Sequence, residues 1–318
     1  MIKLLVEEHN ASPDAQENYK SALGLACKQL LFESHEDRLQ HIQYLLGKGA
    51  DPNRVLNGMT PLQLCAEAGH IEGFKLLLAG GADLALKGNL YFFWSMLGRL
   101  PPLAIAAKAG HVDFVKYLLS HHACEKGEDG NPLPPHLRLS FQDVISAFEN
   151  SVHSKKSELI LFLLDELRWR KVLTVASDAP AVEKSVAPEI INSLTMLLSM
   201  YPRPENIVSL AQLLLNEWKK EVRATTTLPS QYLYAPAVVD GNVPLLKLLV
   251  NEGLDVNDLL ISGRTALHEA VIKKNANYCS ALLRCGANPN IKVKRVRNLL
   301  SFLLSLSLSL SLSLSLSL

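Results

Sequence analysis

The sequence predicts an all-α solenoid in which short helix–turn–helix units stack side by side. The first observation is a leucine pair that returns along the chain, followed in its best copies by Gly-Ala-Asp or a close variant. The second is the spacing of these pairs, which never falls below 32 residues. Larger intervals fit one unit plus an insertion, which stacked units tolerate because each unit still reaches its neighbours. The pairs are Leu4-Leu5, Leu45-Leu46, Leu77-Leu78, Leu118-Leu119, Leu163-Leu164, Leu214-Leu215, Leu248-Leu249 and Leu282-Leu283.

Residues 57–86 show how one unit is expected to fold. Thr60 and Pro61 begin a helix, since threonine caps helix N-termini and proline is accepted in the first turn. Gly69 ends it, and a second short helix follows. Helices of about two to three turns do not persist alone in water, so their stability must come from stacking. Apolar residues at helical spacing are Leu62, Cys65 and Ala66 in the first helix and Phe74, Leu77 and Leu78 in the second.

The residues of this unit carry a family resemblance. Asn57–His70, read as Asn-Gly-Met-Thr-Pro-Leu-Gln-Leu-Cys-Ala-Glu-Ala-Gly-His, resembles the first half of an ankyrin repeat almost position for position. Pro101–His111 and Gly263–Ala270 follow the same pattern. The resemblance implies an ankyrin repeat stack, whose helix–turn–helix units are joined by short β-hairpin loops. It is highly specific over 57–86 and 262–290, good over 101–123 and 232–257, and poor over 19–53 and 133–220.

The chain is expected to divide into eight segments. Within 124–230 we expect two helix pairs, 140–150 with 158–167 and 188–200 with 205–221; a small inserted helical element is the alternative to degenerate repeats. The segments are a partial repeat with only a second helix (1–14), a repeat with an insertion (15–56), a repeat (57–86), a repeat with an aromatic insertion (87–123), degenerate helical repeats (124–230), two further repeats (231–258 and 259–291), and a basic, then Ser-Leu low-complexity tail (292–318).

The tail departs from the repeat pattern. Ser301–Leu318 ends in strict Ser-Leu alternation, which a simple TC dinucleotide tract encodes, so our hypothesis is a translated intron or microsatellite and an incomplete gene model. A membrane anchor is a minor alternative, because Leu299–Leu318 is long enough but carries serine at every second position. An exposed strand with an all-leucine face would be an aggregation hazard. Lys292–Arg297 resembles a nuclear-import patch, which leaves a nuclear location as an alternative.

Composition excludes several classes of protein. The net charge of +1 supplies no basic field for nucleic acid. The five cysteines are odd in number and scattered, which fits reduced thiols in the cytoplasm better than a disulfide framework. The N-terminus reaches Glu7 and Glu8 too early for a secretion signal.

No motif in the sequence predicts catalysis. Phosphate-binding, dinucleotide-binding, zinc-protease and hydrolase motifs do not occur. His70, His111 and His268 are expected to hold backbone or cap helices. The cluster His121-His122-x-Cys124 has metal-binding residue types but no second ligand pair, so a loop is the better interpretation. We therefore predict no enzyme activity, no cofactor, no metal and no small-molecule substrate.

The resemblance implies a partner-binding concave face lined by hairpin tips and first helices. The insert Lys87–Leu100 adds four successive aromatic residues, which are costly to expose without a cover or a partner. They either fold back over the neighbouring repeat or form an aromatic hot spot. The aromatic residues are Tyr91, Phe92, Phe93 and Trp94, and the other predicted contact positions are Asn57, Met59, Glu67, Arg99, Leu100, Lys108, Arg264, Glu269 and Lys273.

One loop residue resembles a modification site of the family. Asp255-Val256-Asn257, with Leu249 eight residues before Asn257, is similar to the substrates of the oxygen-dependent asparaginyl hydroxylase. Asn53 and Asn290 follow proline and match less well. The alternative is that Asn257 only accepts the turn geometry of these loops.

The function expected from these observations is a non-catalytic scaffold or adaptor that binds one or more proteins, with no nucleic acid and no membrane as partners. One alternative is the regulatory ankyrin region of a larger protein, such as an ion channel, a ubiquitin-ligase adaptor or a zinc-finger protein. Others are a small enzyme within 124–231 and a bacterial effector of host cells.

Overall fold

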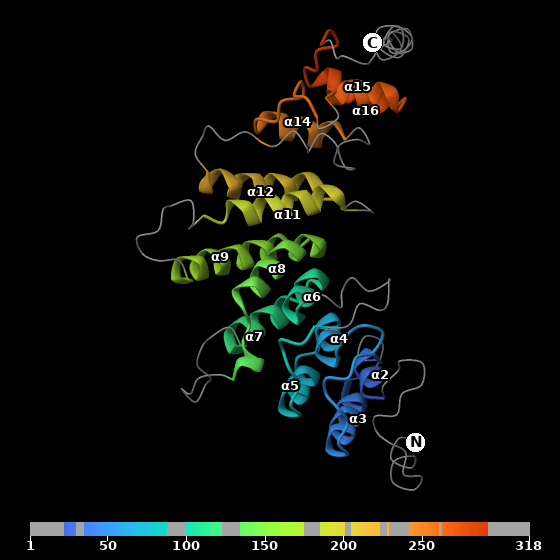
Figure 1. Cartoon of the computed structure of the whole chain (residues 1–318), viewed down its shortest axis with the longest axis vertical. Coiled ribbons are helices and arrows are strands. Elements are labelled where there is room, and N and C mark those ends of the chain that lie inside the picture. Colours follow the sequence, from blue (N-terminus) through green and yellow to red (C-terminus); the bar gives the residue numbers. More distant parts are fainter. Residues whose placement is uncertain are drawn as a thin grey trace. The chain divides into compact units, whose positions relative to one another are not determined.

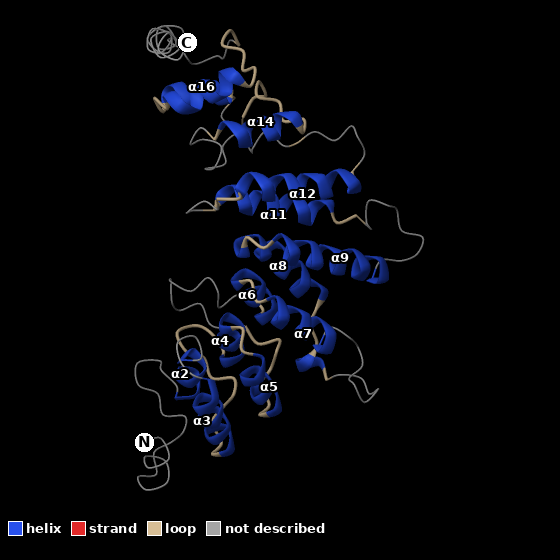
Figure 2. Cartoon of the chain, turned by 180° about the vertical axis from the view of Figure 1, so that it is seen from behind, coloured by secondary structure: helices blue, strands red, loops and turns tan. Residues whose placement is uncertain are grey.

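The computed structural model describes residues 22–29, 35–87, 100–122, 134–174, 185–200, 205–222, 228, 242–260 and 263–291. In these ranges every regular element is a helix, apart from one isolated antiparallel bridge between Leu56 and Met59. The helices follow one another in antiparallel pairs (Figures 1 and 2). The predicted all-α class is therefore confirmed. The chain forms two compact units, residues 1–189 and residues 190–318.

The first unit is a stack of helix pairs. Its first helices pack in chain order, α2 on α4, α4 on α6 and α6 on α8, while the second helices α3 and α5 also contact each other. Short 3-10 turns, η2 (Pro135–Leu137) and η3 (Val152–Ser154), precede and follow α8. The helices are α2 (Ala22–Gln29), α3 (His35–Gly47), α4 (Pro61–Ala68), α5 (Ile71–Ala79), α6 (Pro102–Ala109), α7 (Val112–His122), α8 (Phe141–Ser151) and α9 (Ser157–Thr174).

The second unit repeats the scheme. Here α12 packs on α14, α14 on α16, and α15 pairs with α16. The helices are α11 (Ala187–Ser199), whose first residues up to Glu189 belong to the first unit, α12 (Ile207–Glu221), α14 (Val243–Asn251), α15 (Ala266–Ile272) and α16 (Ala276–Arg284). The segment 1–14, residues 88–99 of the aromatic insert and the tail 292–318 lie outside the described residues.

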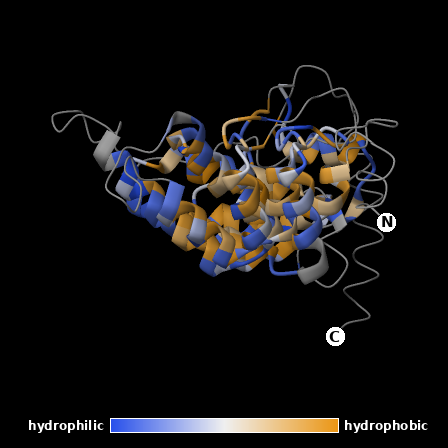
Figure 3. Cartoon of the chain, turned by 90° about the horizontal axis from the view of Figure 1, so that it is seen from below, coloured by the Kyte–Doolittle hydropathy of each residue, from blue (hydrophilic) through white to orange (hydrophobic). Residues whose placement is uncertain are grey.

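The recurring leucine pairs supply the core. In every described pair the first leucine is buried, and Leu45, Leu77 and Leu282 are fully inaccessible to solvent. Along the helices hydrophobic and hydrophilic residues alternate (Figure 3). Because apolar burial is the main favourable term in folding, the leucine spacing read from the sequence is the spacing of the packing units.

Helix α4 shows why such a short segment is helical. The Thr60 hydroxyl accepts a hydrogen bond from the Gln63 N–H, and the Gln63 side chain accepts one from the Thr60 N–H at 2.7 Å. This reciprocal pair satisfies two donors that a helix start leaves open. Gly69, at φ +69°, closes the helix in the left-handed region, which glycine enters without a side-chain penalty. The predicted start and end of this helix are confirmed.

The helices of the middle segment begin close to the predicted positions, but α9 is longer than predicted. It continues seven residues beyond Leu167, to Thr174. Glu166 and Arg170 form an i,i+4 ion pair at 3.3 Å along this extension, and the Lys171 ammonium reaches Glu189 at 2.9 Å. The Glu166–Arg170 pair, four residues apart, supports the helix beyond its packed part, and the Lys171 contact joins the extension to α11.

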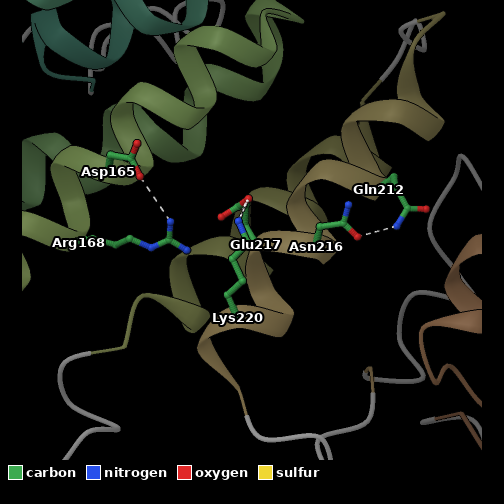
Figure 4. A network of polar contacts seen from close by, with 6 residues as sticks. All are labelled: Asp165, Arg168, Gln212, Asn216, Glu217 and Lys220. Atoms are coloured by element: carbon green, nitrogen blue, oxygen red, sulfur yellow. Dashed lines mark hydrogen bonds and ion pairs between the residues drawn. The ribbon is translucent and has the colours of Figure 1, made fainter.

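Figure 4 shows further contacts of this kind within each unit. In α9, Arg168 pairs with Asp165 at 3.5 Å. In α12, the Gln212 amide donates to the Asn216 side chain at 2.9 Å, and Lys220 pairs with Glu217 at 2.7 Å. All three contacts join residues three or four positions apart on one helix, where such pairs add about 0.5 kcal/mol each at most.

Candidate partner-binding surface

The loops that follow the second helices are joined by an asparagine. The Asp51 carboxylate accepts the N–H of Asn53 at 2.9 Å, which closes the turn. The Asn53 amide then reaches into the loop of the next repeat: its oxygen accepts from the Asp83 N–H at 2.8 Å, and its nitrogen donates to the Gly81 carbonyl at 3.4 Å. One side chain thus fixes the distance between two loops.

The second unit contains the same connection. The Asp255 carboxylate accepts the Asn257 N–H at 2.8 Å. The Asn257 amide oxygen accepts from the Asn288 N–H at 2.7 Å, and its nitrogen donates to the Gly286 carbonyl at 3.4 Å. Sequence analysis did not assign this bridging role to Asn53 or Asn257. The recurrence of Asp-x-Asn before each hairpin was the signal that could have shown it.

The turns between the two helices of a repeat are also tied to the preceding repeat. His70 Nδ1 accepts the Gly73 N–H at 2.9 Å and so caps α5. His111 Nε2 lies 2.9 Å from the Glu67 carbonyl of the repeat before it. In the degenerate repeat that contains α8 and α9, Lys156 takes over this contact and donates to the Gly110 carbonyl at 2.7 Å.

The third position after the threonine cap carries a polar residue that reaches forward to the next loop. The Gln63 amide donates to the Leu100 carbonyl at 2.8 Å. His268 occupies the same position in the last repeat, and its Nδ1 lies 2.6 Å from the Thr265 hydroxyl, as predicted. Burial, and to a lesser extent the nearby charge of Arg264, lowers the pKa of His268. The ring is therefore neutral near pH 7. These contacts fix the start of each first helix.

The other histidines and the cysteines that could carry chemistry make structural contacts or are buried. His121 Nδ1 lies 2.9 Å from the Tyr117 carbonyl, and His122 Nδ1 lies 3.2 Å from the Leu137 carbonyl, while Cys124 lies outside the described residues. A hydrogen bond to the Cys27 thiol and burial raise the pKa of the Cys65 thiol well above its usual value. Burial raises the pKa of Cys279 to about 11. Such protonated thiols are poor nucleophiles.

The predicted contact positions fall into four groups: exposed, partly exposed, buried, and outside the described residues. Asn57 and Lys273 are exposed, while Glu67, Leu100, Lys108, Arg264 and Glu269 are partly exposed. Arg264 and Glu269 are brought together as an ion pair at 3.1 Å, from a hairpin and a first helix. Five predicted residues lie outside the described residues: Tyr91, Phe92, Phe93, Trp94 and Arg99.

Met59 is the one predicted contact position that the structure places in the core. Only 6% of its surface is exposed. Its backbone exchanges two hydrogen bonds with Leu56, at 2.8 and 3.0 Å, across the hairpin. Both side chains are buried there, whereas Arg264, which closes the corresponding hairpin on Leu260, remains partly exposed. Met59 therefore contributes packing rather than surface.

Large apolar residues outside the predicted contact positions are also exposed. Ile272, at the end of α15, is 46% exposed, and Leu259, in the hairpin before it, is 53% exposed. Trp169 on the extension of α9 is 59% exposed. Sequence analysis missed all three. For Ile272 the signal was available, because it lies seven residues after the helix cap, where the two earlier well-matched repeats carry Glu67 and Lys108.

Comparison with known proteins assigns the family. A family model described as ankyrin repeats (three copies) matches residues 1–88 and 203–293, and a model of a single ankyrin repeat matches residues 100–126. The chain therefore belongs to the ankyrin repeat family, whose repeats are generally protein-interaction modules.

A solved structure to which the chain is similar is the crystal structure of the human ASB11 ankyrin repeat domain. It is 21% identical in sequence, with a TM-score of 0.47, and the match covers 85% of this chain and 100% of that chain. No curated protein matches the chain in a sequence comparison. Among the described helices, none is both long and apolar enough to cross a membrane.

Proposed function

We propose that this protein is a non-catalytic scaffold or adaptor that binds another protein through the exposed positions of its hairpins and first helices. The observation that carries the proposal is the hydrogen bonding that ties together the elements holding these positions. Glu67 and Lys108 lie on α4 and α6, whose turns are tied together by the His111 contact at 2.9 Å. Preorganised positions reduce the entropy that binding costs.

The remaining contact positions lie on equivalent elements of their own units. Asn57 lies in the hairpin before α4, and its backbone is held at φ 50° between the bonded residues Leu56 and Met59. Arg264, Glu269 and Lys273 form the corresponding part of the last repeat. We place the protein in a reducing compartment such as the cytoplasm, because its described cysteines are free thiols.

Site-specific photo-crosslinking in cells tests the proposal. A photoreactive phenylalanine analogue placed at Lys108 or Glu67 is expected to crosslink the full-length chain to a partner protein. The matched control positions are Lys75 and Lys116, which are exposed lysines on the second helices α5 and α7. Equal crosslinking from both sets, or none from the first-helix positions, would contradict the proposed surface.

We also propose that the aromatic insert contributes to partner binding. Replacing Phe92, Phe93 and Trp94 together with serine is expected to reduce partner crosslinking from Lys108 several-fold, because aromatic side chains dominate the energy of many interfaces. Helical circular dichroism and the melting temperature should change little. A large fall in melting temperature would instead show that these rings cover the neighbouring repeat.

We propose hydroxylation of Asn257 as a modification of the loop. The added β-hydroxyl would lie beside the Asp255 carboxylate, which already accepts the Asn257 N–H, and it should tighten the turn by about 1 kcal/mol. Mass spectrometry of the tryptic peptide ending at Arg264, from protein made in animal cells, should show one added oxygen on Asn257. The peptide containing Asn53 serves as an internal control. Unmodified Asn257 at normal oxygen would rule out the proposal.

A further inference from the structure

His122 is the last residue of α7 and holds the chain segment that leads into α8. Its ring nitrogen Nδ1 lies 3.2 Å from the Leu137 carbonyl, and its own carbonyl accepts the Leu139 N–H at 2.9 Å. Residues 134–139, which include η2, are therefore bonded to the end of α7 at two points. We call these residues the lead-in segment. It joins the repeat of α6 and α7 to the repeat of α8 and α9.

The two ring nitrogens of His122 have different surroundings. A carbonyl oxygen only accepts hydrogen bonds, so Nδ1 carries the proton and Nε2 holds the lone pair. Nε2 is buried without a hydrogen-bond partner among the described residues, and the whole residue is 8% exposed. The ring packs against two aromatic rings, with centroid distances of 6.5 Å to Phe74 and 5.8 Å to Tyr117. This position suits a neutral imidazole.

A proton on Nε2 is costly in this position. It buries a charge and adds an N–H donor at an atom that faces no acceptor among the described residues. Burial lowers the pKa of His122, and the nearby His121 ring lowers it further, although the bond to the Leu137 carbonyl raises it in part. The closed position of the ring therefore disfavours the protonated form.

The charged groups on the elements around the ring do not offset such a charge. Of the two acidic groups, Glu72 is paired with Lys75 at 2.9 Å, and Asp113 lies nine residues before His122, about 14 Å along the helix. Lys75 lies 5.3 Å over the Tyr117 ring, which His122 also contacts. The titratable and charged residues are Glu72 and Lys75 on α5, Asp113, Lys116 and His121 on α7, and His136 and Arg138 on the lead-in segment.

We propose that His122 is a pH-sensitive clamp on the lead-in segment. In its neutral form the ring holds the segment to α7. Under mildly acidic conditions the ring takes up a proton at Nε2, leaves its buried position for solvent and gives up the Leu137 carbonyl, so the segment opens from α7. A proton is bound and no other covalent bond changes. This inference goes beyond the proposed function and does not depend on it.

The direction of the pH dependence follows from the two positions of the ring. In the open segment His122 is solvated and has the ordinary histidine pKa of about 6.5, whereas in the closed segment its pKa is lower. Above about pH 6.5 both states are neutral, and closure has its full stability. Below that pH the open state binds a proton that the closed state does not. The ratio of open to closed segment then rises by up to about ten-fold per pH unit, until the closed form also titrates.

Hydrogen exchange of the full-length chain, followed by NMR from neutral to mildly acidic pH, tests the clamp. The reporter is the Leu139 amide, which donates to the His122 carbonyl. After correction for the intrinsic pH dependence of exchange, its protection should fall by up to about ten-fold per pH unit below about pH 6.5. The Ala82 amide, bonded to the Leu77 carbonyl at 3.0 Å, is the internal control and should keep its protection.

His122→Asn separates the clamp from other effects of pH, because asparagine keeps an amide donor near the position of Nδ1 but does not titrate. The protection of Leu139 should then be independent of pH. His121→Asn and His136→Asn are the matched controls, since each removes a neighbouring histidine, and both should retain the pH dependence. A pH dependence that survives His122→Asn, or that disappears in either control, overturns the proposal.

A measurement on the wild-type chain tests the same point without any substitution. NMR of the imidazole nitrogens should show His122 protonated on Nδ1 at neutral pH, and its pKa in the folded chain should lie below the ordinary histidine value. A ring protonated on Nε2 at neutral pH, or a pKa of about 6.5 or above, contradicts the clamp even if His122→Asn fails to fold.

Discussion

Leu77→Ala is expected to lower the free energy of unfolding by about 2 to 5 kcal/mol, the range found for buried leucines that leave a cavity. Leu77 is fully inaccessible to solvent in α5. Its neighbour Leu78 is only half-buried, so Leu78→Ala is a matched control of the same chemistry and should cost clearly less. Urea denaturation followed by circular dichroism measures both. Equal losses for the two variants would contradict the packing described here.

The same substitution at Leu282 should act independently of the one at Leu77. Leu282 is also fully inaccessible, but it lies in the second compact unit, whereas Leu77 lies in the first. Sites without shared partners have effects that add within about 0.5 kcal/mol. Hydrogen exchange should locate the destabilisation of each single variant in its own unit. Strong coupling between the two substitutions would indicate one cooperative core instead of a linear array.

The sequence was sufficient to predict the helix pairs because their determinants are local. Thr60 begins α4 and Gly69 ends it through contacts within a few residues. The leucine pairs recur with the spacing of the packing units. The end of α9 was predicted too early. Its last turns depend partly on the contact between Lys171 and Glu189, which are 18 residues apart in the chain. Propensity and periodicity do not contain such a contact.

The binding surface was less predictable because exposure depends on neighbours in space. Met59 and Arg264 close equivalent hairpins, yet only Met59 is buried, at 6% exposure. A pattern derived from variable positions assigns both to the surface. Asn257 was recognised as a loop residue, but its two bonds reach residues 29 and 31 positions further along the chain. Such a role becomes visible only when the next repeat is in place.

Gly69→Ala should be among the most destabilising substitutions in the turns of the chain. It should lower the free energy of unfolding by roughly 2 to 4 kcal/mol, from backbone strain and overpacking together. A Cβ atom at residue 69 would lie 2.5 Å from Nδ1 of His111 and 2.6 Å from its Cγ. The ring cannot easily move away, because its Nε2 is bonded to the Glu67 carbonyl at 2.9 Å. The backbone φ of +69° adds strain for any residue with a side chain.

Gly81 separates the two contributions. Its φ is +90°, but a Cβ atom there would meet nothing within 4 Å, so Gly81→Ala should cost about 1 kcal/mol from the backbone alone. In a His111→Ala background, Gly69→Ala should lose its steric part and fall to the same value. Thermal and urea unfolding of the four variants measures this cycle. If Gly69→Ala costs as much without the imidazole as with it, the close packing of successive turns is not what requires glycine at this position.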